Sequence, residues 1–212
     1  MIDEILAYNR AFVTNKGYKP YTTSKYPDRK LAIVTCMDTR LIELLPAALG
    51  IKNWDAKIIK NAGGVIVHPF GSAVRSLLIA IYELNVEEIM IIGHTDCGVG
   101  SIDIEAMLKK MEKRGISETV IRDLGYCGID FNKWLGGFDD VEISVKESVS
   151  LLRRHPLLPK NIEIHGLVMD SRTGALSLVE KNWFFLFKEH HEILVLLLES
   201  FNYVKKYGIM EK

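Results

Sequence analysis

The stretch "EEIMIIGHTDCGVG", residues 87–100, decides the fold because an apolar run leads directly into polar and glycine residues. The apolar half is typical of a short strand that is covered on both faces. The second half places a histidine and a cysteine, His94 and Cys97, three positions apart at the strand end. A pair of this kind at the end of a buried strand indicates a binding site that other segments must complete.

A second stretch, "LAIVTCMDTRL" at residues 31–41, has the same layout. It reads as a β-branched, apolar strand that ends at Cys36 and is followed by two charged residues, Asp38 and Arg40. In α/β folds, ligands bind beyond the carboxyl ends of parallel strands, where the strand order reverses. If the sheet order begins 2-1-3, the ends of these two strands are neighbours, and we expect Cys36, His94 and Cys97 at one site.

The remaining segments alternate between strand and helix patterns, which predicts an α/β fold with a central, mainly parallel β-sheet of four to five strands flanked by helices. We expect residues 1–180 to form one domain with an N-terminal helical arm, and residues 181–212 to be a helical C-terminal extension of that domain. Helices are predicted at 1–17, 40–50, 71–85, 101–115, 117–125 and 139–154, and further strands at 56–64, 161–170 and 173–180.

Composition narrows the class of protein. The chain has 212 residues, of which 48% are hydrophobic, so it can bury a core of ordinary size. Lys and Arg together number 27, as do Asp and Glu, which argues against a general nucleic-acid binder. No apolar run approaches the length of a membrane span, and the first residues show no signal peptide. With three widely separated cysteines, these features predict a cytoplasmic protein.

Two thiols and one imidazole are ligands that zinc prefers. A set of three protein ligands leaves one tetrahedral position for water, which is typical of catalytic rather than structural zinc sites. Bound zinc lowers the pKa of water towards about 7, so hydroxide becomes available near neutral pH. We also expect the helix predicted after Cys97 to favour the thiolate through its N-terminal amides.

Asp38 and Arg40 alternate with Cys36 along the chain, so an extended backbone would place all three side chains on one face. An arginine fork holds a carboxylate well and would keep Asp38 ionised and off the metal. Asp38 could then accept a hydrogen bond from the reacting water. The glycines of "NAGG", Gly63 and Gly64, would let the backbone approach the site closely.

The segments "CMDTRL" (36–41), "NAGG" (61–64) and "GHTDCG" (93–98) together resemble the signature segments of the β-class carbonic anhydrases, and "IEIHGLVMDSRTGAL" (162–176) resembles the last strand and turn of that family. The resemblance covers roughly residues 1–180. It implies reversible hydration of carbon dioxide to bicarbonate and a proton by zinc-bound hydroxide.

The resemblance also implies specific residue roles. One zinc ion per subunit would be held by Cys36, His94 and Cys97, with Asp38 and Arg40 as a catalytic pair. Family members are dimers or larger, with active sites near the subunit interface, so we expect a homodimer or larger assembly. In some members the aspartate leaves the arginine and takes the fourth zinc position.

Substrate choice is less constrained than the metal site. Candidate pocket residues are the two glycines Gly63 and Gly64 with the apolar side chains Val65 and Val99. One alternative is a zinc hydrolase of carbon disulfide or carbonyl sulfide on the same scaffold. A second is a non-catalytic zinc-binding regulatory protein with Asp38 as permanent fourth ligand, although such a site would not need Arg40.

Other polar residues have simpler interpretations. Asp96 is predicted to cap the helix that follows Cys97. Cys127 has no partner at metal-ligand spacing and is interpreted as structural or incidental. Adjacent positions on a helix diverge by about 100°, so His190 and His191 are interpreted as part of a solvated helix face rather than a metal clamp.

Overall fold

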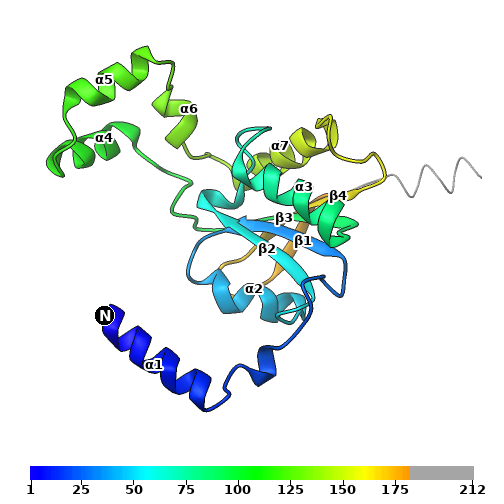
Figure 1. Cartoon of the computed structure of the whole chain (residues 1–212). Helices are drawn as coiled ribbons and strands as arrows, with labels where there is room; N and C mark the ends of the chain where they lie inside the picture. The colour runs from blue at the N-terminus through cyan, green and yellow to red at the C-terminus, as the bar shows by residue number, and fades with distance from the viewer. Residues whose placement is uncertain (182–212) are drawn as a thin grey trace, which may run out of the picture.

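The computed structural model describes residues 1–181, and its centre is a five-stranded sheet in the order β2-β1-β3-β4-β5 (Figure 1). The first four strands pair in parallel, and β5 joins β4 in antiparallel fashion. This confirms the predicted α/β fold with a mainly parallel sheet. The strands are β1 (Leu31–Cys36), β2 (Ala56–Asn61), β3 (Glu88–His94), β4 (Glu163–Met169) and β5 (Leu176–Glu180).

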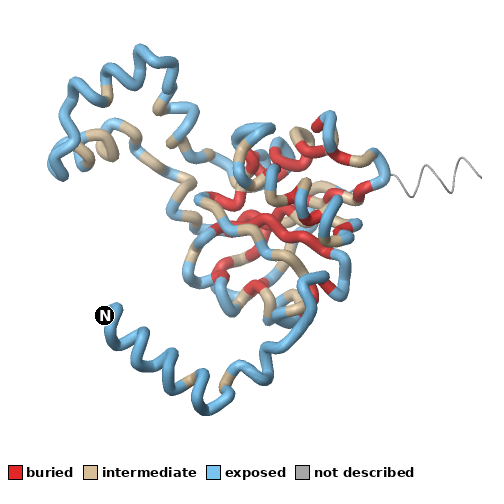
Figure 2. The backbone as a smooth tube through the Cα atoms, viewed as in Figure 1, coloured by how far each residue is buried: buried red, intermediate tan, exposed pale blue. Residues whose placement is uncertain are grey.

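Strand β1 is buried along its whole length, and successive side chains enter two different cores. Ala32 and Val34 belong to the core beneath α3 (Ser72–Leu84) and α7 (Val141–Arg154). Leu31 and Ile33 belong to the core beneath α2 (Leu41–Leu49). Because strand side chains alternate between faces, an apolar run without alternation is what a strand covered by helices on both sides requires. Figure 2 shows the buried residues concentrated in these strands.

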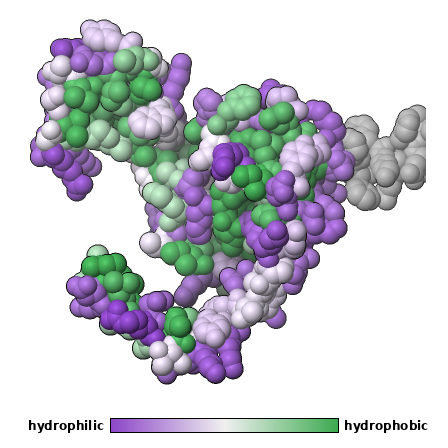
Figure 3. All heavy atoms as spheres, viewed as in Figure 1, coloured by the Kyte–Doolittle hydropathy of each residue, from purple (hydrophilic) through white to green (hydrophobic). Residues whose placement is uncertain are grey.

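Within residues 1–181, four helices lie apart from the sheet and the helices that cover it. None of α1 (Ile2–Thr14), α4 (Ile104–Lys113), α5 (Glu118–Tyr126) or α6 (Phe131–Leu135) has a buried residue. Figure 1 shows α1 and the α4–α6 unit projecting from the sheet and its covering helices, and Figure 3 shows apolar side chains on both. Within residues 1–181, α4 and α6 contact each other, and none of the four helices buries a side chain.

The six helices predicted within residues 1–180 form, with ends shifted by at most three residues. The sequence analysis did not predict α6 or the short 3₁₀ helices η1 (Lys19–Tyr21) and η2 (Ala62–Gly64). The predicted second strand therefore ends at Asn61, and the glycines after it form η2.

The strand order brings the two signature segments together. β1 and β3 are hydrogen-bonded neighbours, while β2 leads away on the other side of β1, so the order reverses at the β1–β3 boundary. Cys36 ends β1 and His94 ends β3. Residues 182–212 lie outside the described residues, so the helical C-terminal extension stays a prediction. Among residues 1–181, no helix is long and apolar enough to cross a bilayer.

Candidate metal centre

Three potential metal ligands converge at the carboxyl ends of β1 and β3. The ligand atoms of Cys36, His94 and Cys97 all lie within 4.8 Å of one another. Cys36 and His94 are buried, and Cys97 is half-buried in the turn after β3. The two sulfur atoms are 3.7 Å apart. The topology thus assembles residues that are 61 positions apart in sequence into one cluster.

The orientation of His94 suits a metal ligand. Its Nδ1 donates a hydrogen bond to the Thr95 carbonyl oxygen at 2.8 Å, which leaves Nε2 as the unprotonated nitrogen. That Nε2 is buried and has no hydrogen-bond partner among the described residues. A buried polar atom without a partner is costly, unless something else binds it.

The spacing of the cluster fits zinc. Tetrahedral zinc with Zn–S bonds of about 2.3 Å separates two sulfur ligands by about 3.8 Å. The Cys36–Cys97 sulfur distance of 3.7 Å agrees with that separation. The donor set, two sulfurs and an imidazole nitrogen with one position left over, is the set expected of a catalytic zinc site.

The protonation of Cys97 differs from the expectation. Burial raises the pKa of its thiol, and the neighbouring Cys36 raises it further, while the Val99 amide opposes the shift. The prediction that a helix N-terminus favours this thiolate is wrong, because α4 begins only at Ile104. A bound metal would itself favour the thiolate, since a coordinating thiol is deprotonated outright.

Asp38 and Arg40 form the predicted pair, but by a different geometry. The Arg40 Nε and Nη2 donate to the two carboxylate oxygens of Asp38 at 3.1 and 2.8 Å. The backbone amide of Arg40 donates to the same carboxylate at 2.8 Å. The predicted alternation along an extended chain is wrong, because β1 ends at Cys36 and the chain turns through residues 37–40. The turn itself brings the side chains together.

The contact with Arg40 makes Asp38 a stronger acid and holds its carboxylate close to the three potential ligands. The hydrogen bond from the Arg40 side chain lowers the pKa of Asp38 from 3.8 to about 2. Asp38 Oδ2 lies 3.9 Å from His94 Nε2, too far for a hydrogen bond. Asp38 is therefore an ionised acceptor beside the three ligands, and its carboxylate is bound to arginine.

Asp96 has a role that the sequence analysis missed. Its carboxylate accepts a hydrogen bond from Arg40 Nη1 at 2.8 Å. The prediction that it caps the next helix is wrong, because Asp103 caps α4 by accepting from the Ala106 amide. The sequence did contain a signal for this role, because Asp96 is an acidic residue between the two ligands His94 and Cys97. Helix capping explained an acidic residue at that position equally well.

Lys60 is a second residue at the site that sequence reasoning did not identify. Its Nζ donates to the Cys36 carbonyl oxygen at 3.3 Å. Burial lowers the pKa of this ammonium group, whereas the nearby Cys36 and Asp38 raise it. Lys60 therefore places a positive charge close to Cys36, which would be a thiolate when it binds a metal.

Glycine is required where the η2 backbone meets β1. Gly64 has φ +67°, and a Cβ there would lie 2.7 Å from the backbone nitrogen of Cys36. Gly63 has φ +84°, and a Cβ would lie 3.2 Å from Phe138 and 3.3 Å from Val99. Both glycines are buried, and neither is among the residues that line the pocket beside the cluster.

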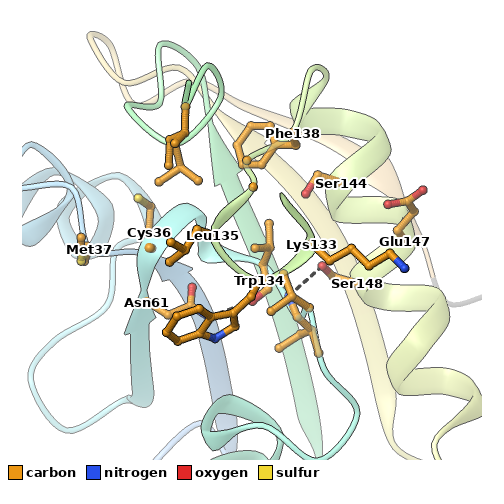
Figure 4. A pocket seen from close by; sticks show the side chains of 18 of the residues that line it. Cys36, Met37, Asn61, Lys133, Trp134, Leu135, Phe138, Ser144, Glu147 and Ser148 are labelled. Carbon is orange, nitrogen blue, oxygen red and sulfur yellow. Dashed lines mark hydrogen bonds between the residues drawn. The ribbon is translucent and has the colours of Figure 1, made fainter. Parts of the chain in front are cut away.

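A pocket of about 1260 Å³ opens beside the cluster. Two predicted pocket residues, Val65 and Val99, line it, as do Cys36 and Asp38. Figure 4 shows Trp134 of α6 and Phe138, which follows that helix, between the Cys36 side of the pocket and α7. Sequence reasoning did not identify this segment, because nothing near it in the chain marks it as part of a site.

Comparison with known proteins identifies the family. The carbonic anhydrase family profile matches residues 31–176. The structure of β-carbonic anhydrase isoform I from Trichomonas vaginalis superposes with a TM-score of 0.77 and 38% identity, covering 85% of this chain and 98% of that one. The chain therefore belongs to the β-carbonic anhydrases, a family of zinc-dependent enzymes.

Two curated relatives show the range within the family. "Putative carbonic anhydrase YtiB" of Bacillus subtilis (strain 168) is 50% identical over 179 residues, which is 84% of this chain and 96% of that protein. A carbon disulfide hydrolase of Acidithiobacillus thiooxidans is 33% identical over 157 residues, which is 70% of this chain and 76% of that protein.

Proposed function

We propose that this protein hydrates carbon dioxide reversibly to bicarbonate and a proton, with one zinc ion per subunit held by Cys36, His94 and Cys97. The observation that carries the proposal is the buried Nε2 of His94, which has no hydrogen-bond partner within residues 1–181 and lies within 4.8 Å of two thiols. An arginine-bound carboxylate, that of Asp38, lies beside it. When bound, zinc supplies a Lewis acid that makes water acidic near neutral pH.

The residues of the chain supply orientation and protection. Asp38 accepts a hydrogen bond from the reacting water and so directs a lone pair of that water towards the carbon of the substrate. Arg40 holds Asp38 ionised and away from the ligands, as its two side-chain hydrogen bonds to Asp38 support. Val65 and Val99 give an apolar surface that suits an uncharged, linear substrate.

The decisive experiment is stopped-flow CO₂ hydration at mildly alkaline pH on protein of measured zinc content. We expect turnover that scales with zinc occupancy. The Asp38→Asn variant should keep its zinc and lose about 10²-fold or more in rate, since it removes a positioned acceptor. Full zinc occupancy without turnover would reject this function. An active Asp38→Asn variant would reject only the role of Asp38.

Hydrolysis of carbon disulfide is the second candidate. It is favoured by the 33% identical carbon disulfide hydrolase and by a pocket of about 1260 Å³ that does not itself exclude a larger triatomic substrate. CO₂ and CS₂ turnover should be compared on one zinc-loaded sample. Turnover of CS₂ with release of hydrogen sulfide, and none of CO₂, would transfer the assignment to this reaction.

We also infer self-association as a homodimer or larger. The exposed apolar side chains of α1, among them Ile2, Ile5 and Leu6, support this inference. The cytoplasmic location stays a prediction from cysteine usage.

A further inference from the structure

A third side chain holds the Asp38–Arg40 pair, and it comes from the segment that supplies Cys97. Asp96 Oδ2 accepts from Arg40 Nη1 at 2.8 Å, and the Asp96 carbonyl oxygen accepts from Arg40 Nη2 at 2.7 Å. Arg40 is thus bound on one side by the end of β1 and on the other by the turn after β3. The contact joins the two signature segments at the site.

The backbone of Asp96 is shaped for this contact. Its φ of +54° is one of four positive values at non-glycine positions among the described residues. Aspartate and asparagine tolerate this left-handed conformation better than most residues. The turn presents both the carbonyl group and the carboxylate of Asp96 to the guanidinium.

The hydrogen-bond donors of Arg40 are divided between its two partners. Nε and Nη2 bind Asp38, while Nη1 is left for Asp96, and Nη2 also reaches the Asp96 carbonyl oxygen. A guanidinium is planar, so partners on two of its edges fix both its position and its plane. The direction of the Asp38 carboxylate depends on that plane.

We propose that Asp96 is a positioning residue, which acts on the reaction through Arg40 and Asp38. Its effect on the rate rests on the proposed function, whereas its effect on Arg40 does not. Asp38 Oδ2 is 3.9 Å from His94 Nε2, so a modest turn of the pair would move the carboxylate relative to the ligands. Asp96 restricts that turn.

The exposure of the groups sets the size of the effect. The side chain of Asp96 is 70% exposed and that of Arg40 is 39% exposed, so solvent and salt screen their ion pair. Exposed pairs of this kind correspond to about a two- to fivefold change in an equilibrium or a rate. The Asp96 carbonyl contact persists in any substitution, which also limits the loss.

The first test observes Arg40 directly by NMR, in zinc-loaded protein labelled with ¹⁵N-arginine. The Arg40→Lys variant identifies the Arg40 Nε–H signal by its disappearance. We expect Asp96→Asn, which tolerates the same φ, to accelerate hydrogen exchange at this Nε–H about two- to fivefold at low salt. The control Glu105→Gln removes an exposed charge on α4 and should leave the exchange unchanged.

The second test is a double-mutant cycle in CO₂ hydration. Asp96→Asn should lower kcat about two- to fivefold with KM and zinc content unchanged, and the loss should shrink at high salt. In an Arg40→Ala background the same substitution should have no further effect, because its route to Asp38 is gone.

The outcomes separate the two proposals. Unchanged Nε–H exchange in Asp96→Asn overturns the positioning role, whatever the enzyme does. An equal loss of kcat with and without Arg40 also overturns it. Faster exchange in a zinc-loaded protein that hydrates no CO₂ supports the role of Asp96 on Arg40 and rejects the proposed function.

Discussion

Asp38 illustrates how one neighbour sets the chemistry of a residue. Its carboxylate receives the Arg40 amide and two Arg40 side-chain donors, and its pKa falls from 3.8 to about 2. Because the folded-state pKa is lowered, the ionised carboxylate stabilises the fold above about pH 3.8. That stabilisation is lost as the pH falls towards about 2.

We therefore expect Arg40→Ala to raise the pKa of Asp38 towards its ordinary value. The carbonyl signal of Asp38, followed by ¹³C NMR as metal-free protein is acidified from pH 5, should titrate near 3.8 in the variant and near 2 in the wild type. Arg122→Ala, which alters a surface pair on α5, should leave the curve unchanged. A low pKa that persists in Arg40→Ala would contradict this cause.

At the same scale, the ligand assignment predicts metal loss. Cys36→Ser should reduce zinc content to a small fraction of one per subunit, because a buried hydroxyl is a far poorer zinc ligand than a thiolate. Cys127→Ser, at an exposed cysteine outside the cluster, is the matched control and should retain zinc. Metal analysis after exhaustive dialysis measures both. Full zinc in Cys36→Ser would remove Cys36 from the ligand set.

The sequence predicted the identity of the clustered residues better than their geometry. Ligand types at strand ends sufficed to nominate Cys36, His94 and Cys97, since parallel strands end at a common edge. The sequence did not show that the chain turns after Cys36, so the Asp38–Arg40 contact was attributed to strand alternation. The Asp96 contact depends on a positive φ that no residue pattern specified.

At the scale of elements, the meeting of η2 with β1 is the tightest requirement. Gly64 and Gly50 both have positive φ, +67° and +61°, but only Gly64 lies against another backbone. Gly50→Ala should cost about 1 kcal/mol through φ alone. Gly64→Ala should cost about 1–3 kcal/mol more, because its Cβ would lie 2.7 Å from the Cys36 nitrogen.

Urea unfolding of both variants, each at a known zinc content, measures this difference. Gly64→Ala should also bind zinc more weakly, because relief of the collision displaces Cys36. Equal unfolding free energies for the two variants would show that η2 shifts freely and does not support the ligand.

Element prediction succeeded where a hydrophobic pattern was long enough to show a period. The fourteen residues of α7 present a regular buried face, including Val145, Val149 and Leu152. Helix α6 has five residues and no buried side chain, so no periodicity marked it. The pocket wall formed by α6 and the segment after it went unpredicted for the same reason.

For the molecule as a whole, the exposed apolar side chains of α1 are the feature that most favours self-association. This amphipathic helix of thirteen residues has no buried residue, so it gains little stability from packing against the rest of residues 1–181. We expect removal of residues 1–17 to leave the circular dichroism of the sheet and its covering helices intact and to weaken self-association. Sedimentation velocity over a range of concentrations measures the shift to smaller species.

A double substitution tests whether the apolar side chains of α1 drive association, without shortening the chain. The double substitution Ile5→Ser with Leu6→Ser removes two exposed apolar side chains of α1 and should weaken association in the same direction. Asp3→Asn on the same helix should have little effect. An unchanged assembly after removal of residues 1–17 would assign association to another surface, such as the α4–α6 unit.

The 3.7 Å separation of the Cys36 and Cys97 sulfur atoms also has a consequence for how the protein withstands air. A disulfide requires about 2.05 Å, so a small approach would join the two thiols once no cation separates them. Chelator-treated protein exposed to oxygen should lose two titratable thiols and its capacity to take up zinc, and dithiothreitol should restore both. Metal-loaded protein should keep both thiols under the same conditions, because the bound ion would protect its two cysteine ligands from oxidation.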